Sequence, residues 1–170
     1  AKANGVLIKV LEDESQEPMV RHEAAEALGA IACPESTTVL EKYLKDPKTE
    51  VAETCELALA RIKWLQNPDL CNQTTNPYNS VDPAPPANNQ NIPQLRSTLL
   101  SNELPLFERY RAMFALRNLR SKEAVEALGD ALFHGSALFK HEIAFVLGQL
   151  QDEHSVPYLK KSLEDDGENE

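Results

Sequence analysis

Two histidine–glutamate pairs are the residues of this sequence best suited to chemistry. They are His22-Glu23 and His141-Glu142, and each follows a basic residue, Arg21 or Lys140. Imidazole nitrogen and carboxylate oxygen together suit iron, manganese or zinc better than magnesium. Neighbouring residues of a helix point about 100° apart, so one pair can supply half of a metal site at the edge of a buried stripe. Two matched pairs across a cleft could form a dinuclear site, and iron with open positions would imply oxygen chemistry.

The same pairs also have a simpler explanation. A single His-Glu dipeptide is common, and the helix dipole alone favours a glutamate in the first turn of a helix. Glu53-Thr54 and Tyr110-Arg111 stand at the equivalent places of two weaker copies, and neither can supply a second histidine. Packing and solvated charge account for Tyr110-Arg111, and His134 and His154 are expected at the surface. Because a repeat duplicates decorative residues along with functional ones, symmetry alone leaves the metal site open.

The two pairs lie in copies of one internal repeat. Residues 19–31 return as residues 138–150, with His22 and His141 119 positions apart. Residues 50–59 are a weaker copy 31 positions after the first, and residues 108–116 are a weaker copy 31 positions before the last. A period of this length is typical of an α-solenoid, in which helix pairs stack on one another. Pro18 suits the first turn of a helix, where its missing N–H costs nothing. The sequence therefore predicts an all-α fold, an α-solenoid of two-helix repeats.

A composition shift divides the repeats into two halves. The stretch 66–91 is rich in Asn, Pro, Gln and Thr and has no apolar period. We therefore expect an N-terminal half over 1–65, an extended linker over 66–91 and a C-terminal half over 92–170. The proline-rich part of the linker is expected to set the separation of the halves rather than fold with either, and a helix is expected to resume over 92–103.

Composition narrows the class of protein further. The 170 residues include 17 basic and 27 acidic side chains, which gives a net charge of −10 and argues against nucleic acid. There is no apolar run of about 20 residues, no signal-peptide layout, no phosphate-binding glycine loop and no Cys-x-x-Cys motif. Cys33, Cys55 and Cys71 are expected to be reduced. These features predict a cytoplasmic protein without membrane or nucleic-acid partners.

Several runs of this sequence closely resemble deoxyhypusine hydroxylase. They are residues 17–31, 80–86, 105–118 and 135–142, and the resemblance extends over essentially the whole chain. It implies HEAT-like repeats in two halves that face each other across a non-haem di-iron centre. It also implies O2-dependent hydroxylation of the deoxyhypusine side chain of a translation initiation factor. An acidic surface suits such a cationic side chain.

The resemblance also implies roles for the two pairs. His22 and Glu23 would bind one iron and His141 the other, while Glu142 matches a carboxylate suited either to supporting the metal ligands or to the substrate amine. The family carries four His-Glu pairs, and the period puts the two missing mates before residue 1 and after residue 170. We therefore expect the central portion of an enzyme that holds two Fe(2+) when complete. Weak or absent iron, little turnover and self-association through exposed repeat ends are expected of this chain alone.

Two readings compete with the enzyme. HEAT-like repeats of this small-residue type also resemble phycobilisome lyases and non-catalytic protein-binding scaffolds, which use a concave surface and need no metal. A third reading, an inactive folded fragment, is compatible with the enzyme family. The matched His-Glu pairs and the family-like linker favour the hydroxylase, since a generic scaffold has no reason to contain them.

Overall fold

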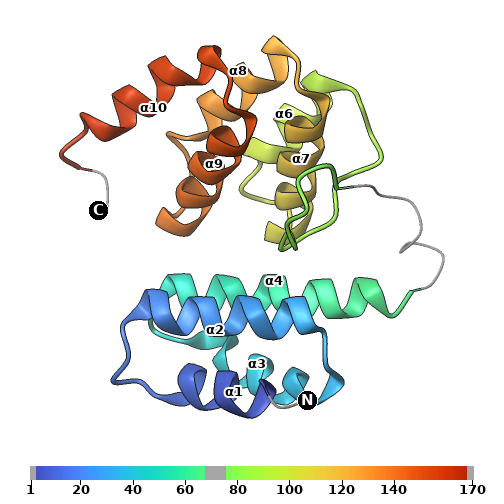
Figure 1. Ribbon diagram of the computed structural model, residues 1–170, viewed down its shortest axis with the longest axis vertical. Coiled ribbons are helices and arrows are strands. Elements are labelled where there is room, and N and C mark those ends of the chain that lie inside the picture. Colours follow the sequence, from blue (N-terminus) through green and yellow to red (C-terminus); the bar gives the residue numbers. More distant parts are fainter. Residues whose placement is uncertain (1–2, 68–75, 168–170) are drawn as a thin grey trace. The chain divides into compact units, whose positions relative to one another are not determined.

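The computed structural model describes residues 3–67 and 76–167, and this part of the chain is helical, without strands. It forms two compact units (Figure 1). Unit 1 contains the described residues before 68 together with Val81–Ala84, and unit 2 contains the described residues of 76–80 and those from Pro85 onward. Cys71 lies outside the described residues. No helix in the described ranges is both long enough and apolar enough to cross a membrane.

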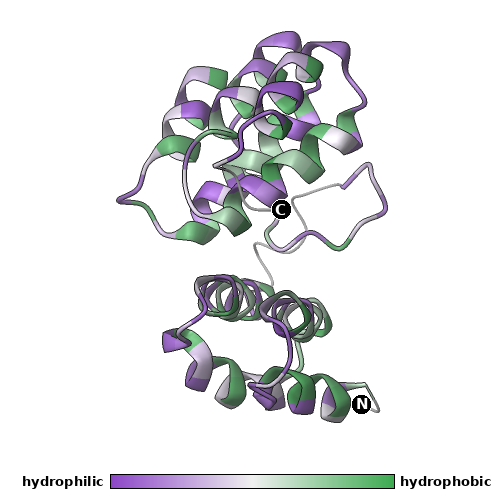
Figure 2. Cartoon of the chain, turned by 90° about the vertical axis from the view of Figure 1, so that its left-hand side faces the viewer, coloured by the Kyte–Doolittle hydropathy of each residue, from purple (hydrophilic) through white to green (hydrophobic). Residues whose placement is uncertain are grey.

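In unit 1, helix α2 is packed between two neighbours. The helices are α1 (Asn4–Glu12), α2 (Pro18–Ile31), α3 (Thr37–Lys42) and α4 (Thr49–Leu65), with short 3-10 turns at Pro34–Ser36 and Tyr43–Lys45. Helices α2 and α4 run side by side, and α1 contacts α2 (Figure 1). Their shared core includes Leu11, Ala25, Leu28, Leu40 and Cys55, which are fully buried. Apolar and polar residues alternate around these helices, as amphipathic packing requires (Figure 2).

Unit 2 repeats this arrangement with a more aromatic core. Its helices are α6 (Ile92–Leu100), α7 (Leu106–Leu119), α8 (Lys122–Ala131), α9 (Ala137–Leu150) and α10 (Val156–Leu163), with a 3-10 turn at Glu153–Ser155. Tyr110 makes edge-to-face contacts with Phe114 and Phe139, at centroid distances of 6.3 and 5.9 Å. Helix α6 ends at Leu100, so the predicted helix over 92–103 was three residues too long.

Helix boundaries confirm the predicted repeat. Helix α2 starts at Pro18 and α9 at Ala137, which is the predicted spacing of 119, and both helices have 14 residues. Helix α7 also has 14 residues and starts 31 positions before α9. All three end on a residue with left-handed backbone, namely Ala32, Arg120 and Gln151, with φ of 55°, 54° and 51°. The all-α prediction and the two-helix unit are therefore correct.

The basic residue before the His-Glu position is a structural element of the repeat. The Arg21 guanidinium donates from Nε to the Leu11 carbonyl oxygen at 2.9 Å, and Arg109 donates from Nε to the Leu99 carbonyl oxygen at 3.0 Å. Both acceptors lie ten residues earlier, in the last turn of the preceding helix, where carbonyl groups lack helical partners. Arg21 also pairs with the buried carboxylate of Asp46 at 2.6 Å. These contacts fix each inner helix to the one before it.

The described part of the predicted linker differs from a free spacer. Ala84 is fully buried, and the Arg61 side chain donates from Nε to the Asp82 carbonyl oxygen at 3.1 Å. The Ala87 N–H donates to the Arg111 carbonyl oxygen at 2.9 Å. The expectation that this segment folds with neither half is thus corrected: single residues and backbone groups, rather than an apolar period, attach it to the units. The boundaries 1–65, 66–91 and 92–170 remain a proposal.

Candidate functional site

His22 lies in the second turn of α2, on the face that packs against α4. Its side chain is almost completely buried. The imidazole Nδ1 lies 2.6 Å from the hydroxyl oxygen of Thr54 on α4. The other ring nitrogen, Nε2, lies 3.9 Å from a Glu23 carboxylate oxygen and 3.8 Å from a Glu26 carboxylate oxygen. One side of the ring is therefore attached to the neighbouring helix and the other is directed toward two carboxylates.

The carboxylate of Glu26 is a further candidate donor beside His22 that was not predicted from the sequence. It is half-buried, whereas the Glu23 side chain is 72% exposed. Burial raises the pKa of Glu26, and the negative charges of Glu23 and Asp82 raise it further. The signal was available, because His22 and Glu26 are four residues apart and such residues share one face of a helix, whereas His22 and Glu23 do not.

In unit 2 the burial of the pair is reversed. His141 is exposed, and Glu142 is buried at 8% exposure. Helix α9 contacts α7 and α8, and no later helix of the described residues covers it as α4 covers α2. At the place equivalent to Glu26, unit 2 carries Phe145, which is half exposed. The two pairs are equivalent in sequence position but have different surroundings.

The donors of unit 1 suit a transition metal in chemical type, and each carboxylate lies within reach of a metal bound at His22. Two ligand atoms that each lie about 2.1 Å from a metal ion are at most about 4.2 Å apart, and the distances from Nε2 of His22 to the two carboxylates are below this limit. Nevertheless, no set of three or more His, Cys, Asp or Glu side chains within residues 3–67 and 76–167 is arranged to hold a metal ion. His22 and its two carboxylates are therefore a partial donor set. That the pairs of the two units face each other stays a prediction.

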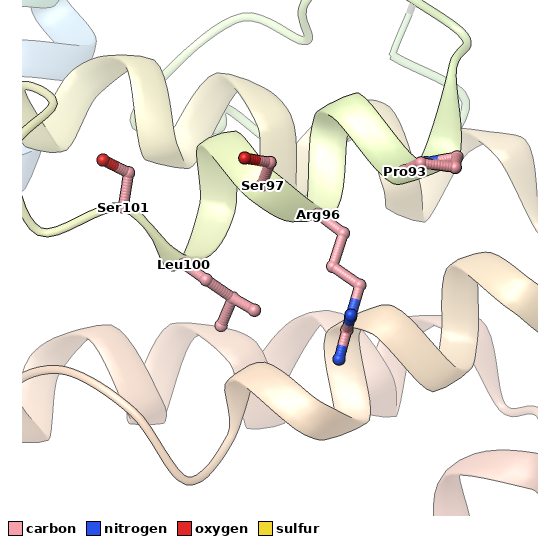
Figure 3. Close-up of a pocket in the computed structure, with 5 residues that line it drawn as sticks. All are labelled: Pro93, Arg96, Ser97, Leu100 and Ser101. Carbon is pink, nitrogen blue, oxygen red and sulfur yellow. The ribbon is translucent and has the colours of Figure 1, made fainter.

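A shallow pocket on α6 is unrelated to these residues. It has a volume of about 510 Å³ and is lined by Pro93, Arg96, Ser97, Leu100 and Ser101 (Figure 3). Arg96 reaches from α6 toward α8, where its guanidinium pairs with Asp130 at 2.8 Å. None of the predicted site residues lines this pocket.

Comparisons with known proteins connect the repeat to a family. A family model described as HEAT repeats matches residues 1–69 and 92–170. Deoxyhypusine hydroxylase of Danio rerio is 59% identical over 165 residues, covering 94% of this chain and 53% of that protein. The Drosophila melanogaster deoxyhypusine hydroxylase is 54% identical over 171 residues, covering 100% of this chain and 56% of that protein.

A solved structure agrees with these similarities. Human deoxyhypusine hydroxylase in complex with glycerol has a TM-score of 0.92 and 53% sequence identity, with 99% of this chain and 58% of that chain covered. The chain thus spans somewhat more than half the length of the proteins it matches. The chain belongs to the HEAT-repeat family and, within that family, it resembles deoxyhypusine hydroxylases over nearly its whole length.

Proposed function

We propose that this chain functions in the O2-dependent hydroxylation of the deoxyhypusine side chain of a translation initiation factor. The observation that carries the proposal is the similarity to deoxyhypusine hydroxylases from several animals, at 54–59% identity over 94–100% of this chain. Two consequences are part of the proposal. The substrate is a protein that bears a cationic side chain, and the reaction takes place in the cytoplasm, where translation factors act.

The proposed metal is Fe(2+), with two ions per complete enzyme. His22 and Glu23 would hold one iron, His141 the other, and Glu142 would be either a ligand or a catalytic residue that contacts the substrate amine. Imidazole and carboxylate donors suit iron, and iron with open positions supplies the activation of O2 when it is bound. The partial donor set of unit 1 supports this choice, because Nε2 of His22 is directed toward carboxylates on its own helix.

The carboxylates of unit 1 would also attract the substrate. Glu23, Glu26 and Asp82 are close enough for their charges to act on one another. Such a concentration of negative charge lowers the energy of an approaching ammonium group and excludes anionic side chains. In unit 2 the carboxylate of Glu142 is of the chemical type that accepts hydrogen bonds from an ammonium group. Both features favour a cationic side chain as the substrate.

The test uses single histidine variants. In a protein of the relatives' full length that contains this chain, we expect His22→Ala and His141→Ala each to lower the iron content and to reduce the hydroxylation of a deoxyhypusine-bearing initiation factor by at least about 100-fold. His134→Ala is the matched control, because His134 is an exposed histidine outside the repeat position and should leave both quantities unchanged. Iron content is measured by metal analysis and hydroxylation by mass spectrometry of the factor.

Two outcomes would count against the proposal. If both variants keep the iron and the activity of the parent protein, these residues are not the metal site. If a protein of the relatives' full length that contains this chain binds the initiation factor but neither takes up iron nor hydroxylates it, the scaffold reading is favoured instead.

A further inference from the structure

We propose that Thr54 is a positioning residue that holds the His22 imidazole in its Nδ1–H tautomer and presents Nε2 as a ligand for a divalent metal. The inference rests on the proposed function only in naming the metal. The tautomer itself follows from hydrogen bonds within unit 1. Thr54 is 2% exposed and lies on α4, whereas His22 lies on α2, so the contact joins two helices.

The tautomer of His22 depends on where the single proton of the Thr54 hydroxyl lies. A threonine hydroxyl has one proton to donate and two lone pairs to accept. Thr54 donates its proton to the Glu50 carbonyl oxygen at 2.6 Å, one helical turn earlier on α4, which is a common arrangement for threonine within a helix. The same oxygen lies 2.6 Å from Nδ1 of His22. Because the only hydroxyl proton is already engaged, the proton between Thr54 and His22 belongs to the imidazole.

The opposite assignment is disfavoured by the geometry at Thr54. If Thr54 donated to Nδ1, its oxygen would lie 2.6 Å from the Glu50 carbonyl oxygen with no proton between them. In the favoured assignment the neutral ring has its lone pair on Nε2, on the side of Glu23 and Glu26. The assignment concerns the neutral ring, because a protonated ring carries a proton on both nitrogens.

Thr54 stands at the position of a His-Glu pair in the next copy of the repeat. Glu53-Thr54 occupies the place of a His-Glu pair in the copy that follows His22-Glu23. That copy has no histidine of its own, yet its threonine reaches back to the histidine of the preceding copy. Hydrogen bonding to the non-ligating nitrogen of a metal-binding histidine fixes the ring orientation and commonly changes metal affinity by about 10- to 100-fold. Thr54 has the geometry for this role.

The primary test is nitrogen NMR of the metal-free chain, because it requires neither metal nor activity. We expect His22 to show a protonated Nδ1 and an unprotonated Nε2 near neutral pH. Thr54→Val, which keeps the shape and removes the hydroxyl, should shift these resonances toward the usual mixture of tautomers. Thr54→Ser should restore the parent pattern. The exposed imidazole of His141 serves as an internal reference that neither variant changes.

The second test is the binding of ferrous ion under anaerobic conditions. We expect Thr54→Val to weaken binding by about 10- to 100-fold and Thr54→Ser to bind as the parent does. Urea unfolding of each variant shows whether a loss of affinity merely reflects unfolding, and restoration by serine identifies the hydroxyl as the cause.

The two tests separate the failure of this inference from the failure of the proposed function. The inference is overturned if parent His22 carries its proton on Nε2, or if Thr54→Val changes neither the tautomer nor the affinity. If the parent chain shows the expected tautomer but a protein of the relatives' full length that contains it neither binds iron nor hydroxylates the factor, the proposed function fails while the assignment of the proton stands.

Discussion

Gly29 is the residue that most directly controls the distance between α2 and α4. A Cβ atom added at this position would lie 2.7 Å from Cβ and 2.8 Å from Cα of Ala58 on α4. The second of these atoms is backbone, so no side-chain rotation relieves the contact. Gly148 is the repeat-equivalent residue on α9, and an added Cβ there meets nothing within 4 Å. Gly29→Ala and Gly148→Ala are therefore the same chemical change, made at a crowded position in α2 and at an open position in α9.

The expected magnitude follows from two opposing effects. Ordinary carbon contacts begin near 3.4 Å, so the helices would have to separate by about 0.7 Å to accept the new methyl group. Overpacking of this kind costs about 1–3 kcal/mol, whereas alanine gains about 1 kcal/mol over glycine within a helix. Because one of the contacted atoms is backbone, we take the upper part of the overpacking range, about 2–3 kcal/mol, and expect Gly29→Ala to lower the free energy of unfolding by about 1–2 kcal/mol. Gly148→Ala, which retains only the helix preference, should leave stability unchanged or raise it by up to about 1 kcal/mol.

Urea unfolding of the two variants measures this difference. Trp64 is the single tryptophan and lies on α4 in unit 1, so its fluorescence reports on the unit that contains Gly29, while circular dichroism reports on both units. We expect Gly29→Ala to shift the fluorescence transition to lower urea and Gly148→Ala to leave it in place. The same separation of helices would lengthen the contact between His22 and Thr54, so the nitrogen resonances of His22 should change only in Gly29→Ala. An unchanged fluorescence transition in Gly29→Ala would refute the reasoning.

Three further predictions follow from other contacts. Burial raises the pKa of Asp46, but hydrogen bonds from Arg21 and a backbone N–H, with nearby positive charges, more than offset this and lower it below 3.8. The ionised carboxylate therefore stabilises the fold above about pH 4, and this contribution is lost as pH falls through the lowered pKa. Asp46→Asn should lower the free energy of unfolding by about 3 kcal/mol at neutral pH. Urea unfolding across pH should show this penalty shrinking in acid. Gln151→Gly should stabilise unit 2 by about 1 kcal/mol in a thermal melt, because φ of 51° strains any residue with a Cβ atom. Burial raises the pKa of the Cys55 thiol to about 12, so peptide mapping after alkylation at neutral pH should find Cys33, and not Cys55, modified in the folded protein.

The repeat could be read from the sequence because it fixes local structure. Two of its signals belong to single helices: the proline at the first helical position and the inner stripe of small and apolar residues. The spacing of 31 is the length of one helix pair. The boundaries of α2 and α9 accordingly agree with the predicted spacing to the residue. The attachment of residues 76–91 to the units was not predictable in this way, since it depends on individual hydrogen bonds to Asp82 and Ala87 rather than on a periodic pattern.

The site could be predicted only in part, for a physical reason. His22 and Glu23 were identified from residue type and duplication, but a sequence alignment compares equivalent positions and does not show which positions touch. Thr54 aligns with Glu23 in the next copy, and its contact with His22 depends on how closely α4 approaches α2. Glu26 was not predicted because it is not adjacent to His22 in the sequence but lies one helical turn away, on the same face of α2.

The two His-Glu pairs occupy equivalent repeat positions, but their burial is reversed, so replacing the histidine has different structural effects in the two units. The His22 ring is held between two helices, and its replacement by alanine removes a buried hydrogen bond and leaves a cavity. His141 is exposed and its replacement removes neither, whereas replacing Glu142 alters a buried group. Under the proposed function, a loss of activity in His22→Ala would therefore combine damage to the fold with loss of the proposed ligand, while the same loss in His141→Ala would report on the proposed chemistry alone. Because Thr54 contributes the hydrogen bond but no metal ligand, its replacement distinguishes the two effects within unit 1.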